Sequence, residues 1–148
     1  MARLLRLLRD CRGLSAVEFA IMLPVTILML GGLIDFGIAA NQRTSLENGA
    51  RAGAQVAMYR GLELEQIKAS VIDATDLELV ADDIDASEFY ECDNAINVKV
   101  EADHQCTDGS GLGKYITVTA SKSYEPIFTF LDFAIPTELK GSAVVRVP

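Results

Sequence analysis

Three groups of side chains in this sequence are candidates for chemistry. One is Glu18, a lone carboxylate near the start of a long apolar run. The second is the pair Cys92 and Cys106, and the third is His104 together with an acidic stretch, residues 73–93. The chemistry open to these groups is an ion pair within a membrane, a disulfide bond, and metal binding or nucleophilic catalysis, respectively.

His104 and the acidic stretch form no complete catalytic or metal-binding motif. His104 lies two residues from Cys106, but no third ligand or base is spaced to complete a site. In the acidic stretch, Glu88 stands where an EF-hand loop requires glycine. The sequence also contains no Ser/His/Asp set, P-loop or HExxH motif. We therefore expect a solvated acidic face, with no catalytic residues, no metal, no cofactor and no small-molecule substrate, and we expect the protein not to be an enzyme.

Charge is divided unequally along the chain, whose formal net charge is −8. Residues 1–13 hold four arginines against one aspartate, a net charge of +3. The remaining residues hold nine Lys/Arg against twenty Asp/Glu, a net charge of −11. Because phosphates would be repelled by the acidic body, nucleic acid is not an expected partner.

The apolar run has the length of a membrane span. Residues Phe19–Ile34 carry no charge, and the wider segment Leu14–Ile34 contains only Glu18. Twenty-one helical residues extend about 30 Å, the thickness of a hydrocarbon core. The rest of the chain is too small and too polar to bury such a helix on all sides. The positive-inside rule then places the N-terminus in the cytoplasm and the acidic body outside it. A cleaved secretory signal is the alternative, but no small-x-small cleavage site directly follows the run.

Periodicity along the chain predicts an α+β fold. A long helix is expected from Leu14 to Arg60, transmembrane in its first half and stopped by Gly61. A short helix is expected to follow over Leu62–Asp73. The acidic stretch has no clear period and is expected to be a solvated connector with a short helical or extended piece. Alternation of apolar and polar residues then predicts a three- to four-stranded antiparallel sheet. Its strands are expected at residues 96–102, 115–121 and 142–147.

These elements divide the chain into three parts. Residues 1–13 are expected to be a basic cytoplasmic leader, 14–37 the transmembrane helix, and 38–148 an extracytoplasmic α+β domain. Gly49 and Gly53 lie on a small-residue face of the helix, which could contact either a neighbouring subunit or the protein's own sheet.

The three cysteines differ in their expected compartment. Cys11 lies in the cytoplasmic leader and should stay reduced, whereas Cys92 and Cys106 lie in the exported body, where disulfides persist. A bridge between them would close a loop of about 15 residues and contribute roughly 3 kcal/mol. The alternative is two unpaired structural thiols.

Residues 12–20, RGLSAVEFA, carry a recognisable pattern at the membrane entrance. Gly13 is followed by the apolar residue Leu14, and Glu18 is the fifth residue after Gly13. The pattern resembles the cleavage region of type IV prepilins and pseudopilins, in which a membrane peptidase cuts after the glycine and leaves a glutamate at position five. The resemblance implies processing between Gly13 and Leu14.

An ion pair between subunits would give Glu18 a role. Cleavage would create an ammonium group at Leu14, and Glu18 of one subunit could neutralise that amine in a neighbour, which would set their axial register. Alternatively, Glu18 only extends to the cytoplasmic interface. Pro24 leaves the carbonyl of Ala20 without its helical partner, which either permits bending of packed helices or is simply tolerated.

A wider resemblance covers both ends of the chain. AVEFAIMLPVTILMLGGLIDFG, the following ENGARAGAQVA, and the C-terminal ITVTASKSYEPIF and LKGSAVVRV resemble the TadE-like family of tight-adherence (Flp-type) pilus proteins. Asp35 is a departure, because the family more often has Glu there. The resemblance implies a minor pseudopilin of the bacterial inner membrane with a periplasmic C-terminal domain. Its expected assembly residues are Glu18, Phe19 and Pro24.

The resemblance also implies partners. They are the prepilin peptidase, other pilins and pseudopilins, and inner-membrane pilus assembly proteins, and whether the subunit enters the extracellular pilus stays open. The alternative function is a signal-anchored exported binding module that is not incorporated into a pilus.

Overall fold

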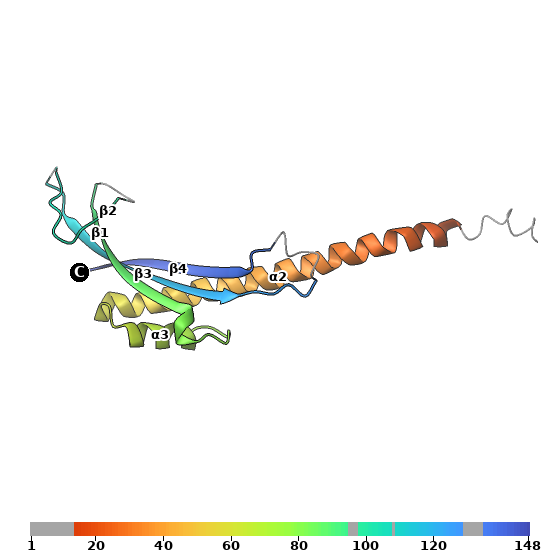
Figure 1. The fold of residues 1–148 in the computed structure, drawn as a ribbon, viewed down its shortest axis with the longest axis horizontal. Coiled ribbons are helices and arrows are strands. Elements are labelled where there is room, and N and C mark those ends of the chain that lie inside the picture. The colour runs from red at the N-terminus through yellow and green to blue at the C-terminus, as the bar shows by residue number, and fades with distance from the viewer. Residues whose placement is uncertain (1–13, 95–97, 108, 129–134) are drawn as a thin grey trace, which may run out of the picture.

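The computed structural model describes residues 14–94, 98–107, 109–128 and 135–148 and has the predicted α+β architecture (Figure 1). The helical elements are α2 (Leu14–Arg60), α3 (Leu64–Asp73) and the short 3-10 helix η2 (Ala81–Asp83). The strands are β1 (Ile84–Cys92), β2 (Lys99–Val100), β3 (Leu112–Ser123) and β4 (Glu138–Val147). They form one antiparallel sheet in the order β2-β1-β3-β4.

Helix α2 consists of a free half and a packed half. Its 47 residues extend about 70 Å, and the N-terminal part projects away from the rest of the protein (Figure 1). The C-terminal part lies along the sheet. The helix ends where Gly61, with φ of 74°, donates its N–H to the carbonyl of Ala57 at 2.8 Å. This left-handed residue is a common helix stop, as the sequence predicts.

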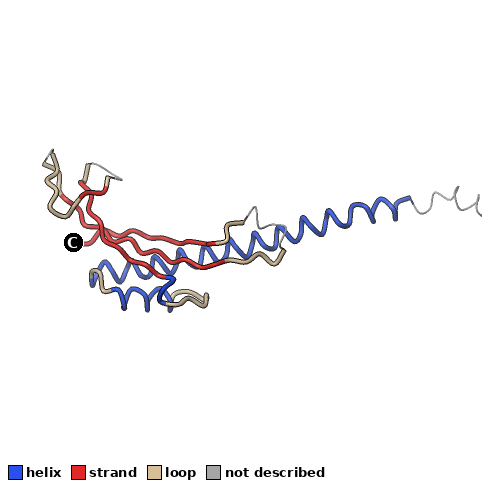
Figure 2. The backbone as a smooth tube through the Cα atoms, in the orientation of Figure 1, coloured by secondary structure: helices blue, strands red, loops and turns tan. Residues whose placement is uncertain are grey.

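The core lies between the sheet and the packed half of α2. Alternate residues of β3, Ile116, Val118 and Ala120, are fully buried on the face towards the helix. Helix α3 runs beside α2 (Figure 2) and buries Ile67 and Val71. Apolar burial of this kind is the main stabilising contribution to such a small domain.

The structure corrects the prediction for the acidic stretch. Residues 84–92 are more than a short extended piece of a connector: they form strand β1, which pairs with β3 along its whole length, from Ile84 opposite Ala120 to Cys92 opposite Leu112. The strand was missed because the exposed polar residues Ser87 and Glu88 follow each other in its middle and hide the alternation. Lys114 on β3 forms an ion pair with the exposed Glu88 at 2.7 Å.

The first predicted strand is also much shorter than expected. Of the described residues within 96–102, Lys99 and Val100 form a strand, β2, at the edge of the sheet; residues 95–97 lie outside the described residues. The other two strands are longer than predicted, and the short helix begins at Leu64.

Close backbone contacts bring the helices and the sheet together. A Cβ atom on Gly49 or Gly53 would lie within 2.6 Å of side chains from α3 and the turn after it, so both glycines contact the protein's own domain. On β4, a Cβ atom on Gly141 would lie 2.3 Å from the backbone nitrogen of Glu47 and 2.4 Å from the carbonyl carbon of Leu46. Strand β4 therefore crosses α2 backbone to backbone at Gly141.

Candidate assembly site

The predicted assembly residues lie on the free half of α2. Glu18 and Phe19 are exposed, and with Ser15, Ile21 and Met22 they line a shallow open surface. Pro24 lies within α2, which continues as a helix on both sides of it. Of the predicted processing site, Leu14 is the first residue of α2, and Gly13 lies outside the described residues.

The free half of α2 has the properties of a membrane anchor. It contains an 18-residue window with a mean hydropathy of 2.2, of which only 6% is buried. A core helix of a soluble domain would be mostly buried instead. This single apolar helix near the N-terminus therefore fits a single-pass membrane anchor.

A buried carboxylate connects this anchor to the domain. Asp35 is fully buried, and its carboxylate accepts hydrogen bonds from the backbone N–H groups of Ile127 and Phe128, each at 2.9 Å. The hydroxyl of Tyr124 donates to the backbone carbonyl of Asp35 at 3.0 Å. We call these four residues the Asp35 clasp. Because two N–H groups satisfy the carboxylate, it can be buried without a cationic partner.

Two further features support the clasp. A Cβ atom on Gly31, one helical turn before Asp35, would lie 3.0 Å from the ring of Phe128, so glycine leaves the space that the ring needs. Burial raises the pKa of the Tyr124 hydroxyl above its ordinary value of 10.0, and the negative charge of Asp35 raises it further. Tyr124 is therefore held in its neutral, donating form.

The role of Asp35 was not predicted from the sequence, in which this residue stands out only as a departure from the family pattern. The available signal was an acid directly after an uncharged apolar run, because a carboxylate in such a place needs partners. No local pattern identifies partners that lie ninety-two and ninety-three residues away.

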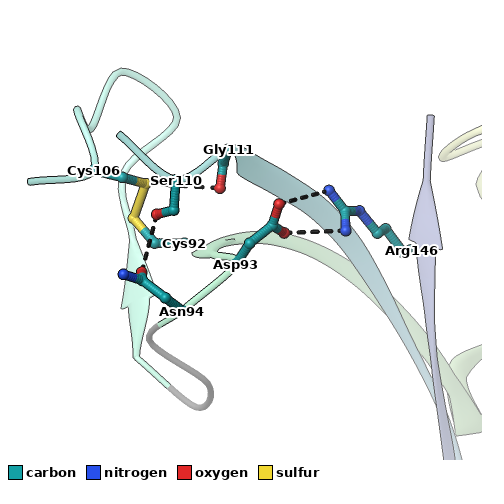
Figure 3. Close-up of a disulfide and its surroundings, with 7 residues drawn as sticks. All are labelled: Cys92, Asp93, Asn94, Cys106, Ser110, Gly111 and Arg146. Carbon is teal, nitrogen blue, oxygen red and sulfur yellow. Dashed lines mark hydrogen bonds and ion pairs between the residues drawn. A yellow bond between two sulfur atoms is a disulfide. The ribbon is translucent and has the colours of Figure 1, made fainter. Parts of the chain in front are cut away.

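At the far end of the domain, Cys92 and Cys106 form the predicted disulfide, with their Cα atoms 5.9 Å apart (Figure 3). The bridge ties the end of β1 to the loop that precedes β3. Next to it, Asp93 forms an ion pair with Arg146 of β4 at 3.0 Å and donates its N–H to the carbonyl of Gly111. The disulfide therefore belongs to a cross-linked tip that joins three strands.

His104 and the acidic stretch, the other residues considered for catalysis or metal binding, do not come together in one site. His104 is exposed, and its neighbour Cys106 is held in the disulfide. In the acidic stretch, the carboxylate of Asp83 accepts the N–H of Val80 at 2.9 Å. Within the part of the chain that the structure describes, no three His, Cys, Asp or Glu side chains gather as metal ligands would.

The fold and the free helix together fit a single-pass, membrane-anchored α+β protein. The model of the family described as TadE-like protein matches residues 13–55, and over this segment the resemblance drawn from the sequence is confirmed. The match supports a protein associated with the tight-adherence (Tad) pilus. The matched segment includes the exposed surface around Glu18 and the buried Asp35. No curated protein and no solved structure matches the chain.

Proposed function

We propose that this protein is a minor pseudopilin-like assembly subunit of a tight-adherence (Flp-type) pilus. In this proposal a prepilin peptidase removes residues 1–13, and the mature subunit acts through packing against other pilins and pseudopilins and inner-membrane assembly proteins. It performs no catalysis itself. The acidic domain stays outside the cytoplasm, at the periplasmic side of the inner membrane.

The observation that carries the proposal is the position of the family match on the structure. The match begins at Gly13 and continues through the free, apolar half of α2, where Glu18 is exposed. A carboxylate on a lipid-facing helix costs a few kcal/mol unless it is paired. An exposed Glu18 therefore has a physical reason to meet the amine of a neighbouring subunit, and a free helical half provides the surface for that contact.

The test is the intact mass of the protein purified from cells with and without the prepilin peptidase. Wild-type protein should lose its thirteen-residue leader only when the peptidase is present, and Gly13→Leu should keep the leader in both cases. Gly37→Leu is the matched control, because a Cβ atom at Gly37 would meet no atom within 4 Å, and this variant should be processed normally.

Two results would oppose the proposal. An uncleaved wild type in cells that contain the peptidase would favour a signal-anchored binding module. A mature N-terminus beyond Leu14 would favour an ordinary secretory signal.

A further inference from the structure

The apolar surface of α2 continues past the buried Asp35. Large exposed apolar side chains occur from Val17 to Phe36, and Phe36 itself is 67% exposed. These twenty residues extend about 30 Å, which equals the hydrocarbon thickness of a bilayer. Because Asp35 faces the domain and is fully buried, its charge does not mark the edge of the span. The outer edge of the hydrocarbon layer is therefore expected near Phe36.

Part of the globular domain lies on the hydrocarbon side of that edge. The ring of Phe128 packs against Gly31, and Gly31 precedes Phe36 by five residues, or about 7.5 Å along the helix. The neighbouring Ile127 is 65% exposed although it is a large apolar residue. In Figure 1 the chain after β3 follows α2 towards its free half, in agreement with these contacts.

We infer that the segment Pro126–Phe128 enters the outer leaflet of the membrane and gives the protein a second lipid contact beside its transmembrane helix. This inference rests on the membrane anchoring that the proposed function includes. The partner is the acyl region of the bilayer, and Ile127 is the side chain that faces it.

The hydrogen bonds of the clasp make such an insertion possible. Backbone N–H groups can enter a hydrocarbon layer only when the protein satisfies them. Pro126 has no N–H, and the N–H groups of Ile127 and Phe128 both donate to Asp35. Glu125 is exposed and precedes Pro126, so we expect its carboxylate to stay at the level of the lipid headgroups.

The segment that leads into β4 also packs next to the outer end of the span. Ile135 and Pro136 line an open pocket of about 150 Å³ together with Phe36 and Ala39 of α2. The end of the domain that lies nearest the span is thus in contact with the outer end of the span, at Phe36. Because Arg43 also lines this pocket and lies beyond Phe36, we expect the pocket to lie at the level of the lipid headgroups.

The absence of tryptophan from the sequence allows a direct test. Full-length Ile127→Trp is reconstituted into phosphatidylcholine–phosphatidylglycerol vesicles that contain lipids brominated on their acyl chains. Leu33→Trp reports on the span, and Val144→Trp replaces an exposed apolar residue on β4 away from the membrane. Tryptophan emission from the Ile127→Trp variant should be blue-shifted and quenched by bromine to an extent similar to that from Leu33→Trp. Emission from Val144→Trp should not be quenched.

The three variants separate the possible failures. Loss of quenching in Leu33→Trp would show that the anchor itself is wrong. Quenching of Leu33→Trp with no quenching of Ile127→Trp would overturn only the inserted segment. A blue shift of Ile127→Trp without bromine quenching would indicate that protein covers the segment, and would also overturn the inference.

A second measurement uses the wild-type protein and does not depend on the folding of a variant. An apolar photoactivatable carbene reagent that partitions into the bilayer is activated in vesicles, and labelled peptides are identified by mass spectrometry. The peptide that contains Ile127 should be labelled together with the span. Label confined to α2 would contradict the inference.

Discussion

The carboxylate of Asp35 accepts a hydrogen bond at 2.9 Å from the backbone N–H of Ile127, ninety-two residues further along the chain. The bond joins the end of the apolar run to the segment that connects β3 and β4. Helix α2 therefore cannot tilt or rotate at this point without moving the domain. Movement or force along the helix would be transmitted directly to the globular part, which suits a subunit that acts by packing.

The clasp should contribute measurably to stability. Asp35→Asn retains one acceptor but turns an amide N–H towards the second donor, and Asp35→Ala leaves both N–H groups without a partner. Each buried group that loses its partner costs about 1–3 kcal/mol, so both variants should lower the free energy of unfolding, Asp35→Ala by more. The measurement is urea unfolding in detergent micelles. Glu125→Gln, an exposed acid of the same segment, is the control and should unfold like wild type. Wild-type stability in Asp35→Asn would mean that the two hydrogen bonds contribute nothing.

The crossing of β4 over α2 should tolerate no side chain at Gly141. A Cβ atom there would lie 2.3 Å from the backbone of Glu47, and backbone cannot move aside as the end of a side chain can. Gly141→Ala should therefore destabilise the domain by about 1–3 kcal/mol or more. Gly37→Ala is the matched control: its Cβ meets no atom within 4 Å, and it should stabilise the helix by roughly 0.5–1 kcal/mol. Equal midpoints of urea unfolding for the two variants would contradict the close crossing.

The disulfide should be oxidised in the exported protein and should stabilise the tip of the sheet. Denatured protein without reductant should show no thiol labelling at Cys92 or Cys106. The double variant Cys92→Ser/Cys106→Ser should lose roughly 3 kcal/mol, the loop-closure value for about 15 residues. Cys11→Ser is the control. Cys11 lies outside the described residues, and its substitution should leave the free energy of unfolding unchanged. Labelling of either Cys92 or Cys106 in the wild type would disprove the bridge.

Tyr124 should make the stability of the domain depend on alkaline pH. Burial raises the pKa of its hydroxyl above 10.0 in the folded protein. Below pH 10 the neutral hydroxyl is present in both states, and its hydrogen bond to Asp35 stabilises the fold by about 1 kcal/mol. As the pH rises above 10, the unfolded chain loses this proton first, so the contribution declines through the folded pKa. The difference in free energy of unfolding between wild type and Tyr124→Phe should shrink over that range. Tyr59→Phe, at an exposed position, should match wild type throughout.

Glu18 should be needed for assembly and not for insertion. Glu18→Ala makes the span more apolar, so the protein should still enter the membrane and should largely be cleaved. In the proposed pairing, the amine of the neighbouring subunit would lose its partner in a low-dielectric layer, at a cost of a few kcal/mol. Co-purification with other pilus subunits and surface piliation should therefore be lost. Glu18→Gln, which keeps the shape but not the charge, should be intermediate or equally defective. Normal piliation in Glu18→Ala would leave the glutamate without a role in assembly.

Features that depend on local pattern could be predicted from the sequence. The long helix from Leu14 to Arg60, its stop at Gly61 and its exposed apolar half all agree with the structure. The physical reason is that hydrophobic length, charge and helix propensity act over neighbouring residues. The Cys92–Cys106 bridge could also be predicted from the sequence, because a short sequence separation and an oxidising compartment favour it.

Contacts between distant segments were decided only by the tertiary structure. Strand β1 pairs with β3 along its whole length, and this register brings Lys114 diagonally next to Glu88, although neither residue indicates the other in the sequence. In the same way, Asp35 is buried at no prohibitive cost because two N–H groups from beyond β3 reach it. A polar residue in an apolar environment is stable only with a partner, and the partner's position depends on how the whole chain folds. The sequence alone therefore determined the apolar anchor, and tertiary packing determined how the domain is held against it.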